Sequence, residues 1–382
     1  MKPAKSSLLF AALALAVSLT PALSAQTAAP APAVSPSLTP PPAATPVTIA
    51  TPVATKTKAP ARPLSKVPSP TRTKDNVEFV IGPDYTWAPE VAARADVPKG
   101  KVIEFTMNSA DSKIYPGISK TQPGTVPYKR TVSVYVPSQY VPGTPAPVII
   151  AQDAYGKSFM PTILDNMIAD KRLPVLVAVM VANGGGDSLG SERGLEYDTV
   201  SGLYSDFIET EVLPRAAKEA NVTFTTDPEG RATLGGSSGA AAAFTMAWFH
   251  PERYHRVISY SGTFVNQQSP LNLSAPREEW KYQPDSPRGA WEYHAKFIPE
   301  SPRKPIKIWL HVSDEDNGHD RDEASLHNWV MANERMVAAL KAKGYTYRYV
   351  FAQSAGHTDG RVIRQTLPGA LEWLWEGYKP KP

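Results

Sequence analysis

Short apolar segments alternate with stretches of helical periodicity over about 300 residues of the chain. Seven of these segments are rich in β-branched and aromatic residues and are bounded by turn residues, which predicts strands. Several are apolar almost without interruption, as strands are when helices cover both faces of their sheet. The predicted strands span residues 130–137, 147–153, 174–182, 231–236, 256–262, 306–312 and 346–353.

Helices are expected between these strands, because two segments carry apolar residues along one helical face. These residues are Leu203, Phe207, Ile208, Val212 and Leu213 in the first segment, and Leu326, Trp329, Val330, Val337 and Leu340 in the second. Gly344 would end the second helix, and Leu371, Leu374 and Trp375 mark a short final helix. This alternation predicts an α/β fold, a mostly parallel central sheet with helices on both faces.

Two long segments interrupt the alternation, residues 181–198 and 266–301, and both are rich in Gly, Pro and aromatic residues. Both follow predicted strands, so we expect them at the carboxyl edge of the sheet, where open α/β sheets bind ligands. Tyr155, Trp280 and Trp291 suggest an aromatic or sugar-binding pocket there, although large aromatic residues after a strand more often serve packing.

The amino terminus predicts two segments before the folded domain. Lys2 and Lys5 precede the run LLFAALALAVSLT, and the small residues ALSAQTA follow, which is the order of a secretory signal peptide over residues 1–25. A retained membrane anchor is the alternative, and no later segment is long and apolar enough to span a membrane. Residues 26–74 are rich in Pro, Ala and Thr and lack aromatic residues, so we expect an extended linker. An exported domain, periplasmic or secreted, is expected over residues 75–382.

Charge and cysteine content narrow the function classes. The chain has 40 basic and 36 acidic residues, but eight of the basic ones and none of the acidic ones precede Asp75. Subtracting these eight leaves 32 basic against 36 acidic residues, so the folded part is mildly acidic and nucleic acid is not an expected partner. The chain has no cysteine, which excludes disulfides.

The strongest chemical signal is the stretch RATLGGSSGAAAAFTMAWF at residues 231–249. A strand, a tight turn of small residues and a helix-favouring run are the setting in which a nucleophile elbow presents a serine. Only Ser237 has glycine two positions away on both sides. We therefore predict Ser237 as the nucleophile and the Ser238 backbone N–H as an oxyanion-hole donor. Ser238 as nucleophile, or a turn without chemistry, is the alternative.

The partners of such a serine follow it in the sequence, each just past a later strand. His357 is the only histidine after the last predicted strand and is the predicted general base, with His294 as its rival. His311, His319 and Asp320 form no recognisable zinc pattern, so neither metal nor cofactor is expected. One carboxylate must orient the imidazole, and the turn after residues 306–312 offers Asp314, Glu315, Asp316 and Asp320.

Several stretches resemble the putative-esterase family of α/β-hydrolases, which includes enterochelin-esterase-like proteins and is related to feruloyl and acetyl-xylan esterases. Among them are GRATLGGSSGAAAAF, GAWEYHAKFIP and YRYVFAQSAGHTDG, and the resemblance covers roughly residues 100–378. It implies the α/β-hydrolase fold and hydrolysis of a carboxylic ester. The family's Gly-x-x-Asp turn implies Asp316 as the acid, although Ser313 replaces the glycine.

The resemblance also implies residues around the site. The family's Arg-x-x-Glu-Tyr stretch matches Arg193, Glu196 and Tyr197, which would bind substrate or brace the loop. Its usual Asp-Gly turn reads Asp153-Ala154 here, and the Ala154 N–H would be a second oxyanion donor. The elbow often continues as Gly-Gly in the family but reads Gly239-Ala240 here, so both departures add a methyl group where space is tight.

These observations predict an exported serine hydrolase that cleaves a small-molecule or carbohydrate ester, for instance a siderophore, phenolic or sugar ester. Ser237 would attack the carbonyl, His357 would move the proton, and Asp316 would orient His357. Tyr155 and the Arg193–Tyr197 segment would bind substrate. An acyltransferase with the same catalytic residues, and a non-catalytic protein that binds the cell envelope or carbohydrate, are the alternatives.

Overall fold

The computed structural model describes residues 77–117, 125–185, 192–267 and 289–380. All of them lie in one structural unit, Arg62–Pro382. The predicted signal peptide and most of the predicted linker lie outside the described residues. So do residues 186–191 and 268–288, which are parts of the two predicted pocket walls and include Trp280.

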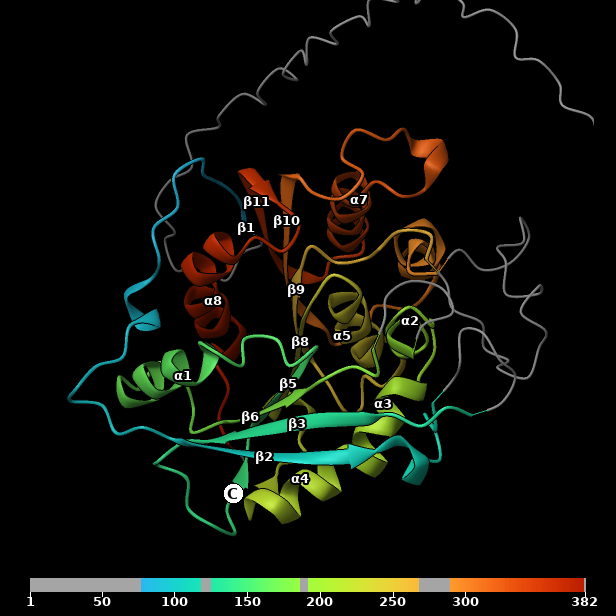
Figure 1. The fold of residues 1–382 in the computed structure, drawn as a ribbon. Helices are drawn as coiled ribbons and strands as arrows, with labels where there is room; N and C mark the ends of the chain where they lie inside the picture. Colours follow the sequence, from blue (N-terminus) through green and yellow to red (C-terminus); the bar gives the residue numbers. More distant parts are fainter. Residues whose placement is uncertain (1–76, 118–124, 186–191, 268–288, 381–382) are drawn as a thin grey trace, which may run out of the picture. The chain divides into compact units, whose positions relative to one another are not determined.

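Nine strands in the described residues form one sheet in the order β1-β11-β10-β9-β8-β5-β6-β3-β2 (Figure 1). The pairs β2–β3 and β3–β6 are antiparallel and every other pair is parallel. The predicted mostly parallel sheet is confirmed, and β1 and β2 are strands that the pattern did not predict. The bounds are β1 Val77–Ile81, β2 Lys101–Asn108, β3 Lys129–Val136, β5 Val148–Gln152, β6 Val177–Val181, β8 Arg231–Gly236, β9 Arg256–Tyr260, β10 Lys307–Glu315 and β11 Thr346–Gly356. A separate pair joins β4 Pro145–Ala146 to β7 Thr223–Phe224.

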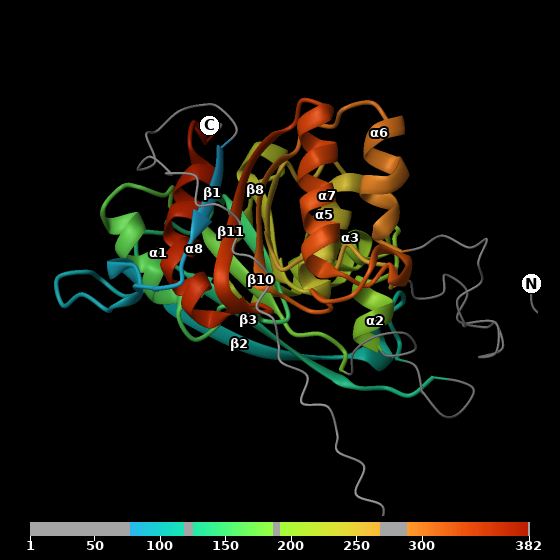
Figure 2. The ribbon, with the colours of Figure 1, turned by 90° about the horizontal axis from the view of Figure 1, so that it is seen from above.

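Helices cover both faces of this sheet (Figure 2). One face packs against α1 (Met160–Ala169) and α8 (Gly360–Trp375). The other face packs against further helices, among them α2 Glu192–Tyr197, α3 Leu203–Phe207, the π-helical turns η3 Ile208–Val212 and η6 Tyr293–Phe297, α4 Leu213–Ala220, α5 Ser238–Phe249, α6 Ile298–Glu300 and α7 Trp329–Ala342. No helix within the described ranges is long and apolar enough to cross a membrane.

Strand β6, which lies between β5 and β3, shows why the predicted strands are apolar without interruption. Val177, Val179 and Val181 belong to the core beneath α5 and α7. Ala178 and Met180 belong to the core beneath α1 and α8. Because successive side chains of a strand point to opposite faces, a strand covered on both sides must be apolar at every position.

The final helix differs from its prediction. It begins at Gly360 rather than near Leu371 and continues through Pro368. Proline has no N–H, so the carbonyl four residues earlier, that of Arg364, loses its helical donor. The Ala88 N–H donates to that carbonyl at 3.1 Å, so the segment after β1 replaces the missing bond and the helix tolerates the proline.

Candidate active site

Ser237 lies in the turn between β8 and α5 with φ of 58° and ψ of −130°. A side chain at Gly235 would collide with the carbonyl of Gly239, and one at Gly239 would come within 2.8 Å of the Asp153 carboxylate. A side chain at Gly236 would run into the ring of Tyr155. The turn therefore requires small residues, and a serine at positive φ in such a turn has the conformation of a nucleophile elbow.

The two adjacent serines have different environments. Ser237 is partly exposed, whereas Ser238 is the first residue of α5 and is buried. The Ser238 hydroxyl accepts a hydrogen bond from Gln267 Nε2 at 3.3 Å and lies 3.5 Å from Thr263 Oγ1. Its backbone N–H has no acceptor among the described residues and points from the helix N-terminus, where free N–H groups favour negative charge. This geometry suits Ser237 for attack and the Ser238 N–H for an oxyanion.

His357 and Asp316 form a close pair. His357 Nδ1 lies 2.6 Å from Asp316 Oδ1, and the carboxylate is fully buried. Burial alone would raise the pKa of Asp316, but the hydrogen bond and charge of His357, with a hydrogen bond from Ser261, hold that pKa below its ordinary value. A buried carboxylate that stays ionised beside an imidazole can orient the ring and stabilise its protonated form.

The other carboxylates of this turn have different positions. Asp314 accepts hydrogen bonds from the N–H groups of Ser354 at 3.0 Å and Ala355 at 3.3 Å, and so fixes the end of β11. Glu315 and Asp320 are exposed. The structure thus brings Asp316, of the four candidates, to His357.

His294, the rival histidine, is buried and lies elsewhere. Its Nε2 is 3.1 Å from the Phe264 carbonyl oxygen, and its ring packs against Trp291 at 4.6 Å between centres. Trp291 is itself only 3% exposed, so the expected role of this tryptophan in a pocket is replaced by a role in packing.

Two side chains that the sequence did not single out connect Ser237 with His357. Thr263 Oγ1 lies 3.3 Å from Ser237 Oγ and accepts a hydrogen bond from Trp329 Nε1 at 3.3 Å. The Trp329 ring stands edge-on to His357 at 6.1 Å. Ser237 Oγ makes no hydrogen bond to His357, both being described residues, and its contact is with Thr263 instead. Catalytic hydrogen bonds are often unformed before substrate binds.

The turn after β5 corrects one prediction. Asp153 and Ala154 both have positive φ, 58° and 49°. The Ala154 N–H donates to the Val181 carbonyl at 2.9 Å, because β5 and β6 are neighbours and their ends lie side by side. The prediction of Ala154 as an oxyanion donor is therefore wrong for this geometry. The Tyr155 N–H is engaged as well, with the Gln152 carbonyl at 2.9 Å.

Arg193 and Tyr197 brace this turn directly and Glu196 supports their helix, so of the two roles that the resemblance left open the contacts favour bracing over substrate binding. Arg193 binds both carboxylate oxygens of Asp153, at 2.9 and 2.8 Å. The Tyr197 hydroxyl accepts the Asp153 N–H at 3.0 Å. Glu196 and Tyr197 are each 1% exposed, too deeply buried to contact a substrate.

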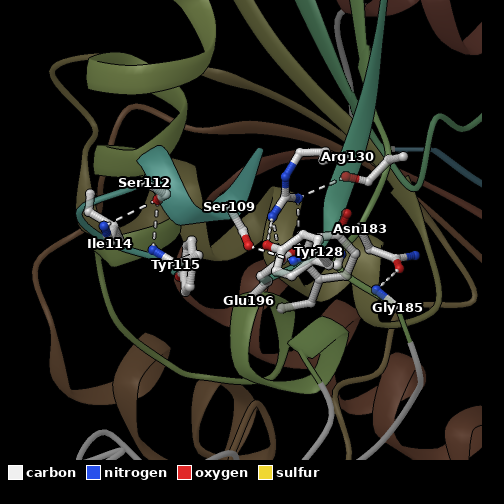
Figure 3. Close-up of polar contacts among 12 residues, drawn as sticks. Ser109, Ser112, Ile114, Tyr115, Tyr128, Arg130, Asn183, Gly185 and Glu196 are labelled. Atoms are coloured by element: carbon white, nitrogen blue, oxygen red, sulfur yellow. Dashed lines mark hydrogen bonds and ion pairs between the residues drawn. The ribbon is translucent and has the colours of Figure 1, made fainter. Parts of the chain in front are cut away.

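Glu196, on α2, forms a buried ion pair with a residue of β3 (Figure 3). It pairs with Arg130 and accepts the Tyr128 hydroxyl at 2.8 Å. The pair is almost fully buried, with 3% and 0% of the two side chains exposed. It anchors α2 to β3 and thereby fixes the position of Arg193 and Tyr197.

Tyr155 is the predicted substrate-binding residue that lies at the elbow. Its ring lies beside Gly236 and stacks on Tyr260 at 6.0 Å. Tyr155 as a residue is partly exposed, whereas its hydroxyl is buried and has no partner among the described residues. The hydroxyl is therefore out of reach of a substrate.

The buried methyl group of Ala240 lies within α5. No group of three or more His, Cys, Asp or Glu side chains in the described ranges is arranged to hold a metal ion.

The sheet order, the elbow after β8 and the acid and histidine after β10 and β11 define an α/β-hydrolase. Residues 124–374 match the model of the family described as putative esterase. This is well over half of the chain, so the chain belongs to the putative-esterase family.

Solved structures agree on the fold. The chain is similar to the enterobactin esterase FES from Shigella flexneri, with a TM-score of 0.50 and 18% identity over 75% of this chain and 62% of that chain. It is also similar to a ferulic acid esterase, with a TM-score of 0.51 and 16% identity over 73% of this chain and all of the other. The chain thus spans less than two thirds of the enterobactin esterase, and at these identities the likeness extends to the fold alone. None of the curated proteins compared with the chain matches it.

Proposed function

We propose that the chain is an exported serine esterase that works through Ser237, His357 and Asp316. The observation that supports this most directly is the 2.6 Å contact between His357 and the buried Asp316, joined through Trp329 and Thr263 to Ser237 on its elbow. Each component has the role its environment suits: an accessible hydroxyl, an oriented imidazole and an ionised buried carboxylate.

The reaction runs through an acyl-enzyme. Ser237 Oγ bonds to the carbonyl carbon while its proton passes to His357 Nε2, and the oxyanion receives the N–H of Ser238. His357 then gives the proton to the leaving alcohol as the ester C–O bond breaks. Water then attacks the acyl-enzyme carbonyl while His357 takes up the proton of the water and passes it to Ser237 Oγ, and the carboxylic acid is released. Before attack, Ser237 Oγ must turn from Thr263 towards His357, which a change of χ1 between staggered positions allows.

The substrate is proposed to be an ester of a small molecule or carbohydrate. The solved structures that share the fold include an enterobactin esterase in the presence of enterobactin and a ferulic acid esterase, and a partly exposed tyrosine beside the elbow, Tyr155, suits an aromatic or sugar ring. We also propose that residues 1–25 are removed on export and that residues 26–74 link the domain to its new amino terminus. Mass spectrometry of the exported protein would show a chain that begins near residue 26; an unprocessed chain would contradict this.

Labelling with a fluorophosphonate tests the mechanism. We expect the wild-type protein to be labelled and to hydrolyse p-nitrophenyl acetate, and Ser237→Ala to lose both properties. Ser238→Ala is the matched control: it removes the neighbouring hydroxyl but keeps the backbone N–H, so it should retain labelling and most activity. Normal labelling of Ser237→Ala, or an unlabelled wild-type protein, would refute the role of Ser237. Transfer of the acyl group to added alcohols in preference to water would identify an acyltransferase instead.

A further inference from the structure

Arg364, in the second turn of α8, lies against two aromatic rings near the carboxyl edge of the sheet. Its guanidinium carbon is 5.0 Å from the ring centre of Trp87 and 4.8 Å from that of Phe159. Nη1 donates to the Gly360 carbonyl at 3.1 Å. In the part of the chain that the structure describes, Arg364 forms no ion pair, whereas Arg361 one turn earlier pairs with Asp359. Arg364 is therefore a partly exposed cation whose remaining N–H groups can bind an anion.

The backbone fixes Trp87 beside this cation. The Ala88 N–H donates to the Arg364 carbonyl that Pro368 leaves free, at 3.1 Å, and the Thr86 N–H donates to Gln365 Oε1 at 2.8 Å. Although both neighbours are tied to α8, the Trp87 side chain is 56% exposed. An indole held in place but left open to solvent is suited to stack on a ring.

This surface adjoins the elbow. Phe159 precedes α1 in the same loop as Tyr155, whose ring lies beside Gly236, the neighbour of Ser237. Burial raises the pKa of the Tyr155 hydroxyl, and the positive charge of Arg364 is near enough to oppose that rise. Tyr155 beside the elbow and Phe159 against Arg364 thus lie in one short loop, which connects the surface at Arg364 and Trp87 to the proposed site.

We propose that Arg364, Trp87 and Phe159 bind a carboxylate carried by an aromatic ring of the substrate, so that the enzyme prefers acidic aryl esters. The planar guanidinium offers parallel N–H donors that match a carboxylate, and the exposed indole covers the ring that carries it. The inference rests on the proposed function, since it takes the reacting carbonyl to lie at Ser237.

Binding without turnover gives the first test. Benzoate and its uncharged analogue benzamide are titrated calorimetrically into Ser237→Ala protein. We expect benzoate to bind at least tenfold more tightly, because a hydrogen-bonded charge contributes far more than a neutral group. Adding Arg364→Gln should abolish the difference, and adding Arg361→Gln, the matched control, should preserve it. Equal binding of the two ligands to the Ser237→Ala protein, or an unchanged preference in the Arg364→Gln protein, would overturn the proposal.

Turnover gives the second test. The substrates are 4-acetoxybenzoate and 4-acetoxybenzamide, which carry a carboxylate or an amide on the opposite side of the ring from the scissile ester. Their rates are normalised to hydroxide-catalysed hydrolysis. We expect kcat/KM to favour the acid roughly tenfold in the wild-type protein and not at all in Arg364→Gln. Equal losses for both esters would mean that Arg364 only packs against Trp87, and would overturn the proposal. If benzoate binding depends on Arg364 but neither ester is hydrolysed, the site stands and the proposed function fails.

Discussion

Ser261 connects the Asp316 carboxylate to the loop that carries His357. Its side chain is fully buried, and its Oγ accepts the Thr358 N–H at 3.1 Å. Its hydrogen bond to Asp316 is one of the contacts that lower the pKa of that carboxyl. Because a fully buried side chain cannot touch substrate, Ser261 is a positioning residue. We expect Ser261→Ala to lower kcat and to leave KM nearly unchanged.

The size of the effect follows from the two contacts. A hydrogen bond to a charged group contributes about 1.5–3 kcal/mol, and a buried N–H left without a partner costs about 1–3 kcal/mol. The bond to Asp316 acts on the pair that stabilises the transition state, and each 1.4 kcal/mol corresponds to about tenfold in rate. We therefore expect kcat to fall roughly 10- to 100-fold. The orphaned Thr358 N–H should appear separately, as a loss of about 1–3 kcal/mol in the free energy of unfolding.

The assay combines steady-state hydrolysis of p-nitrophenyl acetate with urea unfolding. Ser259→Ala is the matched control, because Ser259 is buried in β9, two residues before Ser261, and its hydroxyl has no partner among the described residues. It should change neither kcat nor stability appreciably. Ser261→Gly also removes the hydroxyl but relieves the positive φ of 49°, so it should lose as much activity as Ser261→Ala and less stability.

A Ser261→Ala protein that loses stability while its kcat stays within twofold of wild type would refute the positioning role of Ser261. In that case the hydroxyl would only fix the fold. A rise in KM equal to the fall in kcat/KM, with kcat unchanged, would equally contradict a positioning role, since it would indicate lost substrate binding.

Three further perturbations test other parts of the structure. Burial lowers the pKa of His311 to about 4. Between about pH 6.5 and pH 4 this histidine is protonated in the unfolded chain and neutral in the folded protein. The free energy of unfolding should therefore drop by about 3 kcal/mol as the pH falls through this range. Urea titrations should show that drop in the wild-type protein and not in His311→Gln; parallel curves would contradict it. Glu196→Gln leaves Arg130 buried without its partner charge and should cost about 3–5 kcal/mol of stability, and a loss under 1 kcal/mol would show that the pair is dispensable. Ala154→Gly should stabilise the protein by about 1 kcal/mol by relieving positive φ, whereas a lower melting temperature would show that the turn is not strained.

The sequence predicts the chemistry at Ser237 because the backbone of a nucleophile elbow leaves room only for small residues on either side of the serine. A side chain at Gly235 or Gly239 would collide with its surroundings, so the constraint on the backbone is visible in the residues. His357 could be found for a similar reason, since topology allows few positions after the last strand. The choice of Asp316 among four neighbouring carboxylates needed the family resemblance, because which side chain of a turn points inwards depends on the turn.

Contacts between segments that are distant in the sequence could not be predicted from the residue pattern. Trp329 occupies an apolar position of a predicted helix, and nothing in that pattern indicates that its indole N–H reaches Thr263. The error at Ala154 has the same origin, because its N–H is engaged by Val181, a residue of the neighbouring strand. The final helix begins eleven residues before Leu371 and continues through Pro368, because Ala88 supplies the donor that the proline leaves missing. In each case the deciding partner lies far away in the sequence.

Backbone strain is concentrated at the carboxyl edge of the sheet, and this supports the placement of the site independently of its side chains. Non-glycine residues in the left-handed region each cost on the order of 1–3 kcal/mol and persist only where their surroundings hold them. Lys171, Asn221 and Leu326 are the three such described residues that lie away from the strand ends bearing the site. The other six residues surround the site, and each makes one of the contacts described above or is next to a residue that does. A chain that needed only to be stable would have glycine there, so the strain is what we expect if the proposed site holds an attacking hydroxyl, an acid and a base in fixed positions. These six residues are Asp153, Ala154, Ser237, Ser261, Ser354 and Thr358.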